Sequence, residues 1–165
     1  MFKYFKDCKS IEDVKATYKS LAKQYHPDIA GAEFTATMQE INSEFEKAFD
    51  KYKNIHESAE GNTYETTEQN STETPAEFME IINKLINCEG LNIELIGRWI
   101  WLTGNTYSHK DTIKSLGFKW ANTKKAWYWH SAEDNTVNRK RMTLEQIKEK
   151  YGCQSFQTNS RICIA

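Results

Sequence analysis

The stretch Lys15-Ala-Thr-Tyr-Lys-Ser-Leu-Ala-Lys-Gln-Tyr-His-Pro-Asp28 decides the fold of the first third of the chain. Around and within it, apolar residues recur at steps of three and four, which predicts one buried helical stripe made of Val14, Tyr18, Leu21, Ala22 and Tyr25. Pro27 disfavours helical backbone at His26, so the helix should end just ahead of His26. We therefore expect the triplet His26-Pro27-Asp28 in an exposed loop.

Signals on both sides of this stretch predict a second helix beside the first. Ser10-Ile-Glu-Asp13 has the shape of a capping box and should start the first helix. Helical spacing resumes from about Thr35, with apolar positions at Met38, Ile41, Phe45, Ala48, Phe49 and Tyr52. Because the loop between the two patterns is short, we expect an antiparallel helical hairpin. Lys15, Lys19 and Lys23 repeat every four residues on another face, which predicts a solvated basic ridge.

Together with Gln39-Glu-Ile-Asn-Ser-Glu-Phe45, this stretch resembles the J-domain of DnaJ-type co-chaperones over residues 1 to about 53. The resemblance implies that the loop and the basic helix face dock on a DnaK-type chaperone and stimulate its ATPase. The implied docking residues are His26, Pro27, Asp28, Lys15, Tyr18, Lys19 and Lys23. The sequence departs from the family pattern in three places: the first helix is reduced to little more than Phe2–Phe5, the loop from Ile29 to Phe34 is short, and no fourth helix is evident. The whole chain is similar to short J-domain proteins carried by phages and plasmids of low-GC bacteria.

Composition favours a folded protein without a metal or cofactor. The 165 residues are 39% hydrophobic and 13% aromatic, enough for compact cores. No apolar run is long enough for a membrane span and no secretory leader is recognisable, so we expect a soluble, cytoplasmic protein that does not contact membranes. The four cysteines are widely separated and lack metal-ligand spacing, which favours incidental thiols.

Charge and composition divide the chain into three parts. Residues 54–75 contain five acidic and no basic residues, and they are rich in Ser, Thr, Glu and Asn. Such a segment cannot bury enough apolar surface to fold alone, so we interpret residues 54–74 as a flexible acidic linker. It would separate a J-domain-like hairpin, residues 1–53, from a Trp-rich domain, residues 75–165. The latter is basic, because residues 91–165 carry twelve Lys and Arg against six acids, a net charge of +6.

The third part has the pattern of a small mixed domain. Thr74, Pro75 and Glu77 mark a helix start, and Phe78, Ile81, Ile82, Leu85 and Ile86 form its apolar stripe. Strands are predicted over 93–96, 99–103, 118–120 and 126–130, with a short helix over 109–116 and a last helix from Thr143 to Tyr151. The expected fold class is α+β, with the hairpin followed by a three- to four-stranded sheet flanked by helices.

Five tryptophans between positions 99 and 129 admit two interpretations. They could build the core of a small domain, or some could present rings for stacking on nucleic acid. Leu116-Gly-Phe-Lys-Trp120 and Lys124-Lys-Ala-Trp-Tyr128 resemble small modules attached to DNA-processing and mobile-element proteins. In the second interpretation, Trp127 and Trp129 share a face beside lysines, and a basic run adds phosphate contacts. The candidate nucleic-acid-binding residues are Lys119, Trp120, Lys124, Lys125, Trp127, Trp129, Arg139, Lys140 and Arg141.

These patterns leave two functions open. The first is a co-chaperone adaptor that stimulates a DnaK-type ATPase while the C-terminal domain holds a cargo, either a client protein or single-stranded nucleic acid. The alternative is a nucleic-acid-binding protein of phage or mobile-element origin whose hairpin serves only as a protein-interaction module. An enzyme is not expected, because no carboxylate cluster, His pair or nucleophile motif is present.

Overall fold

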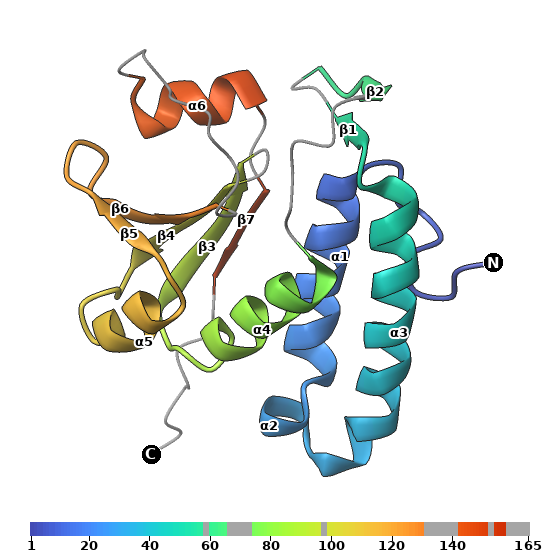
Figure 1. Cartoon of the computed structure of the whole chain (residues 1–165). Coiled ribbons are helices and arrows are strands. Elements are labelled where there is room, and N and C mark those ends of the chain that lie inside the picture. The colour runs from blue at the N-terminus through green and yellow to red at the C-terminus, as the bar shows by residue number, and fades with distance from the viewer. Residues whose placement is uncertain (58–59, 66–73, 97–98, 131–141, 152–153, 158–165) are drawn as a thin grey trace. The chain divides into compact units, whose positions relative to one another are not determined.

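The computed structural model describes residues 1–57, 60–65, 74–96, 99–130, 142–151 and 154–157 (Figure 1). Within these ranges the chain is a mixed helix-and-sheet protein, as expected. It divides into two compact units, Met1–Asn83 and Lys84–Ala165. No helix in the described ranges is both long and apolar enough to cross a bilayer.

The first unit is built on two antiparallel helices, α1 (Ile11–Tyr25) and α3 (Thr35–Tyr52), which lie side by side in Figure 1. α1 begins where the sequence predicts, because the Asp13 backbone N–H donates to Ser10 Oγ at 3.2 Å. The Asp13 carboxylate accepts from the Lys9 N–H instead of the Ser10 N–H, so the predicted capping box is only half formed. The corner between the helices contains a one-turn helix, α2 (Pro27–Ala30), and a 3₁₀ turn, η1 (Ala32–Phe34).

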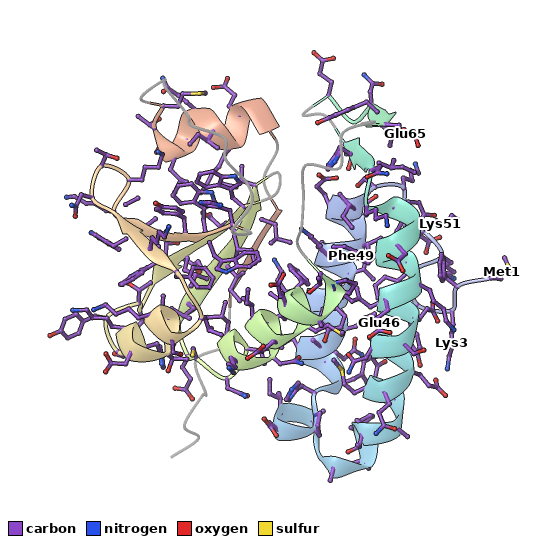
Figure 2. The ribbon with its side chains drawn as sticks, in the orientation of Figure 1. Met1, Lys3, Glu46, Phe49, Lys51 and Glu65 are labelled. Carbon is purple, nitrogen blue, oxygen red and sulfur yellow. The ribbon has the colours of Figure 1, made fainter. Side chains whose placement is uncertain are left out.

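An aromatic cluster forms the core of this unit. The Tyr18 ring lies 4.3 Å from the Phe45 ring, and Phe45 in turn stacks on Phe78 at 5.7 Å, measured between centroids. All three side chains are fully buried. Figure 2 shows Phe49 on the inner side of α3, whereas Lys51 lies on its outer side, as the helical spacing predicts.

Two segments, one at each end of the first unit, differ from the expected arrangement. Residues 2–5 are not helical, but Phe5 is buried 6.0 Å from Phe45, and Glu44 Oε1 accepts from the backbone N–H groups of Tyr4 and Phe5. The helix α4 (Pro75–Leu85) starts with a complete capping box between Thr74 and Glu77. Its residues 75–83 belong to the first unit, because Phe78 completes the aromatic core. The boundary therefore does not fall at residue 75.

Part of the predicted linker is folded. β1 (Ile55–Glu57) and β2 (Thr63–Glu65) form an antiparallel hairpin, and residues 58–59 and 66–73 lie outside the described ranges. The buried His56 places Nδ1 2.7 Å from Glu12 Oε1, and Glu12 Oε2 accepts from the Glu57 backbone N–H at 3.2 Å. A side chain in the first turn of α1 thus replaces the hydrophobic burial that this polar segment lacks.

The second unit is an antiparallel sheet in the order β5-β6-β4-β3-β7. The strands are β3 (Leu91–Ile96), β4 (Trp99–Gly104), β5 (Lys119–Ala121), β6 (Ala126–Trp129) and β7 (Gln154–Gln157). Five strands exceed the three or four expected, because Gln154-Ser-Phe-Gln157 pairs with β3 without any apolar alternation in its sequence. The helices α5 (Lys110–Ser115) and α6 (Leu144–Tyr151) lie on opposite sides of the sheet (Figure 1).

One face of the sheet is covered by α6 and is called the α6 face below. Ile96, Trp101, Ala126 and Ile147 form its buried centre. Glu94 lies on this face and is 7% exposed, and Lys148 Nζ of α6 donates to Glu94 Oε1 at 2.5 Å. The eight-residue α6 is held to the sheet by this ion pair, by Ile147 in the buried centre and by Leu144, which packs against that centre.

Removing the cation from this ion pair should destabilise the second unit. Lys148→Met leaves the Glu94 carboxylate buried without its cation, which should cost about 2–4 kcal/mol, whereas Glu94→Leu with Lys148→Met should recover most of that loss. Urea unfolding followed by tryptophan fluorescence measures both. Equal stability of Lys148→Met and wild type would show that the ion pair does not hold α6.

The hairpin contact gives a separate test. Glu12→Ala removes both hydrogen bonds to His56 and Glu57, so β1 and β2 should detach from α1. Endoproteinase Glu-C, which cleaves after glutamate, should then cut residues 55–65 faster than in wild type. Glu46→Ala, an exposed change on α3, is the matched control and should leave the cleavage rate unchanged. Identical rates in wild type and Glu12→Ala would contradict the packed hairpin.

Candidate functional site

The triplet His26-Pro27-Asp28 forms the corner between α1 and α3. The His26 backbone N–H makes the last hydrogen bond of α1, to Ala22 O at 2.8 Å. His26 Nδ1 then accepts from the Asp28 backbone N–H at 3.2 Å, so the imidazole caps the one-turn helix α2. Pro27 occupies the first position of that helix, where it needs no amide hydrogen bond. The predicted loop is therefore an ordered turn with a defined imidazole position.

The triplet presents a carboxylate beside a sheltered imidazole. The Asp28 side chain is 63% exposed and the His26 side chain 12% exposed, with 3.7 Å between His26 Nδ1 and Asp28 Oδ2. Behind the corner, the rings of Tyr25 and Phe34 pack at 5.7 Å and tie the end of α1 to the start of α3. These contacts fix the backbone of the turn on both sides, while the Asp28 carboxylate stays exposed.

The basic ridge predicted on α1 is wrong for two of its three lysines. Lys15 and Lys19 are 4% and 2% exposed. The Lys15 Nζ atom lies 5.8 Å from the Phe49 ring centroid and 5.3 Å from that of Phe78, a cation–π arrangement inside the first unit. Lys23, nearest the triplet, is half-buried. Spacing placed these lysines on one face correctly, but it could not show that α4 supplies Phe78 to that face.

Tyr18 is a core residue and not part of a docking surface. Its hydroxyl donates to Asn42 Oδ1 at 3.0 Å, and its ring contacts Phe45 and Phe78. Burial raises the pKa of the Tyr18 phenol well above its ordinary value. Of the seven implied docking residues, the structure thus brings His26, Pro27, Asp28 and Lys23 together at one end of α1, while Lys15, Tyr18 and Lys19 are buried.

The candidate nucleic-acid residues fall on two faces of the sheet. Trp127 is opposite both Leu102 and Trp120, and Trp129 is opposite Ile100, so these tryptophans share the face away from α6. Trp127 is 7% exposed, Trp129 is half-buried and Trp120 is 44% exposed. Trp127 is therefore a core residue, and among these three only the Trp120 ring is largely exposed.

The lysines lie elsewhere than the prediction placed them. Lys119 is opposite Tyr128 in the β5–β6 pair, and Lys124 Nζ lies 5.5 Å from the Trp101 ring centroid, so both are on the α6 face. Lys125 is exposed in the turn, with a left-handed backbone at φ 48°. Arg139, Lys140 and Arg141 lie outside the described residues. The expected platform of Trp127, Trp129 and lysines is thus split by the sheet.

Three other observations bear on chemistry. No group of three or more His, Cys, Asp or Glu in the described part of the chain could hold a metal ion. Cys8 and Cys88 are buried free thiols, and burial raises the pKa of each. Among buried side-chain atoms of the described residues, Glu94 Oε2 and Trp101 Nε1 have no hydrogen-bond partner. Glu94 and Trp101 are direct cross-strand partners on the α6 face.

The buried position of Lys15 predicts how charge changes on α1 act. Lys15→Glu puts a carboxylate against two ring faces and should cost about 3 kcal/mol or more, because a buried charge without a partner is strongly unfavourable. Lys15→Met, which keeps the apolar stem, should cost less than about 1.5 kcal/mol. The exposed Lys47→Glu on α3 is the control and should stay within about 0.5 kcal/mol. Thermal unfolding in which Lys15→Glu matches Lys47→Glu would contradict this position.

Comparison with known proteins adds no family to these observations. No protein-family model, curated protein or solved structure matches the chain. The case for a function therefore rests on the residues themselves and on the geometry of the α1–α3 corner and the sheet.

Proposed function

We propose that the chain is a J-domain-like adaptor whose first unit docks on a DnaK-type chaperone and stimulates its ATPase. The observation that carries this proposal is the ordered His26-Pro27-Asp28 turn between two antiparallel helices, with Asp28 mostly exposed. In the family that the sequence resembles, this triplet at this position is the trigger. The second unit would then hold the cargo that the chaperone acts on.

Local hydrogen bonding supports a preorganised trigger. His26 is held twice, by its backbone N–H to Ala22 O and by its Nδ1 accepting from the Asp28 N–H. Preorganisation matters because a partner then loses less conformational entropy when it binds the turn. The exposed carboxylate of Asp28 can accept a charge-assisted hydrogen bond from a cationic group of the chaperone.

Burial of Lys15 and Lys19 changes how docking would begin. A fully exposed ridge would steer an acidic partner from a distance, whereas here only Lys23 of the three lies beside the triplet with part of its side chain accessible. We therefore propose docking through short-range contacts at the α1–α3 corner, with weak dependence of the association rate on salt. This differs from the strong steering that the lysine spacing alone predicts.

The second unit favours single-stranded nucleic acid as its cargo. Residues 91–165 carry a net charge of +6, and aromatic side chains of β4 and β6 are partly exposed. Cationic surfaces with aromatic rings bind single strands through phosphate contacts and base stacking, with little sequence preference.

The alternative function is nucleic-acid binding with the hairpin as a simple protein-interaction module. Such a protein would bind nucleic acid in the same way but would not stimulate the ATPase.

The ATPase assay separates these functions. Full-length protein should raise the single-turnover ATPase rate of a bacterial DnaK-type chaperone. Asp28→Asn should lower that stimulation about tenfold or more, because loss of a desolvated charged contact costs about 2 kcal/mol or more. Asn keeps the backbone N–H that His26 Nδ1 accepts from, so folding should not change.

Asp50→Asn is the matched control, since Asp50 is an exposed aspartate on α3 far along the helix from the corner. It should stimulate as wild type does. Stimulation by Asp28→Asn equal to that by Asp50→Asn would refute the trigger role, and no stimulation by wild type from any cognate chaperone would leave the protein-interaction alternative.

A further inference from the structure

The α6 face of the sheet carries a continuous layer of aromatic rings that the candidate nucleic-acid set does not contain. Trp99 and Trp101 come from β4, and Tyr128 and His130 come from β6 and the residue after it. Three pairs of neighbouring planes are close to parallel, at 15° for Trp99–Trp101, 24° for Trp99–Tyr128 and 7° for Tyr128–His130, whereas the Trp99–His130 and Trp101–Tyr128 pairs are tilted by 30° and 39°. The closest centroids are those of Trp99 and His130, 4.6 Å apart.

α6 covers only part of this layer. Trp101, 2% exposed, lies in the buried centre with Ile147, whereas Trp99 and Tyr128 pack at its margin. Trp99, Tyr128 and His130 are all half-buried, so each ring keeps an accessible part. If α6 covered the whole layer, all four rings would be buried. Instead, the rings of Trp99, Tyr128 and His130 extend beyond the buried centre and are partly exposed to solvent.

Cations accompany the rings on this face. Lys124 Nζ lies 5.5 Å from the Trp101 ring centroid, and the exposed Lys119 is the direct cross-strand partner of Tyr128. Within the described strands, the acidic side chain on this face is that of Glu94, which is paired with Lys148. The surface formed by Trp99, Tyr128, His130, Lys119 and Lys124, called the ring–lysine surface below, therefore combines partly accessible, mostly stacked rings with two lysines.

We propose that the ring–lysine surface binds single-stranded nucleic acid, with bases stacking on Trp99, Tyr128 and His130 and phosphates contacting Lys124 and Lys119. This inference rests on the proposed nucleic-acid cargo and assigns it to residues outside the Trp127–Trp129 platform. Charge complementarity decides the class of ligand, because a polyanion with planar bases matches both the lysines and the rings. An apolar client peptide would match the rings but not the cations.

The test uses the full chain and a 5′-fluorescein-labelled twelve-nucleotide oligo(dT), followed by fluorescence anisotropy at several salt concentrations. Trp99→Leu should weaken binding about five- to 150-fold, the loss of one stacked base at ~1–3 kcal/mol. Lys124→Gln should make the slope of log affinity against log salt shallower by about 0.7, since one phosphate contact is lost.

The controls are matched residues on the other side of the sheet. Trp120→Leu changes the most exposed tryptophan, which lies on the face away from α6, and Lys114→Gln changes an exposed lysine of α5. Both should bind as wild type does. His130→Leu provides a ring change at the edge of the layer, and it should weaken binding even where Trp99→Leu disturbs the packing under α6.

The outcomes separate this inference from the cargo proposal. If wild type does not bind the oligonucleotide at low salt, the cargo proposal fails, and the ring–lysine assignment fails with it. If wild type binds but Trp120→Leu abolishes binding while His130→Leu and Lys124→Gln do not affect it, nucleic acid is bound on the opposite face and only the present inference is overturned.

Discussion

The restriction that Pro27 imposes on His26 is the constraint on which the first unit depends. Because the residue before a proline avoids helical backbone, α1 ends at Tyr25 and the chain turns at once. His26 has extended backbone, with φ −65° and ψ 129°, and it serves both as the C-cap of α1 and as the N-cap of α2. The same restriction therefore ends one helix, starts the next and leaves Asp28 exposed at the corner. Structure and proposed trigger have one physical origin.

The aromatic core explains which parts of this unit can be predicted from sequence. Helical spacing and caps are local signals, so the bounds of α1 and α3 and the buried stripe of α4 follow from them. Which helix faces pack together depends on residues that are far apart in the sequence. Phe78, distant in sequence, joins Tyr18 and Phe45, and the Lys15 ammonium is enclosed between Phe49 and Phe78. A four-residue lysine repeat looks the same whether it faces water or a third helix, and for this reason the predicted ridge failed.

The sheet shows the same limit in another form. Period-2 alternation correctly placed Trp127 and Trp129 on one face, and buried strands were recognisable from their apolar content. Register and turn geometry decide where the lysines lie, and neither is encoded in alternation alone. Lys119 pairs with Tyr128 and Lys124 folds over Trp101, so the cations join the ring layer of Trp99 on the α6 face. Two further elements have no apolar alternation that could predict them, namely the polar strand β7 and the folded part of the acidic segment. Pairing with β3 stabilises β7, and the Glu12 carboxylate stabilises the folded acidic segment.

The proposed docking at the His26-Pro27-Asp28 turn can be mapped residue by residue. Backbone amide spectra of ¹⁵N-labelled full-length protein, recorded with and without an ATP-bound DnaK-type chaperone, report which residues are touched. We expect the signals of Lys23, His26, Asp28 and Ile29 to shift or broaden, while those of Lys15 and Lys19 on the buried face of α1 change little. Perturbation centred on Lys15 and Lys19, or spectra that do not change at the α1–α3 corner at saturating chaperone, would contradict the assignment of docking to the His26-Pro27-Asp28 turn.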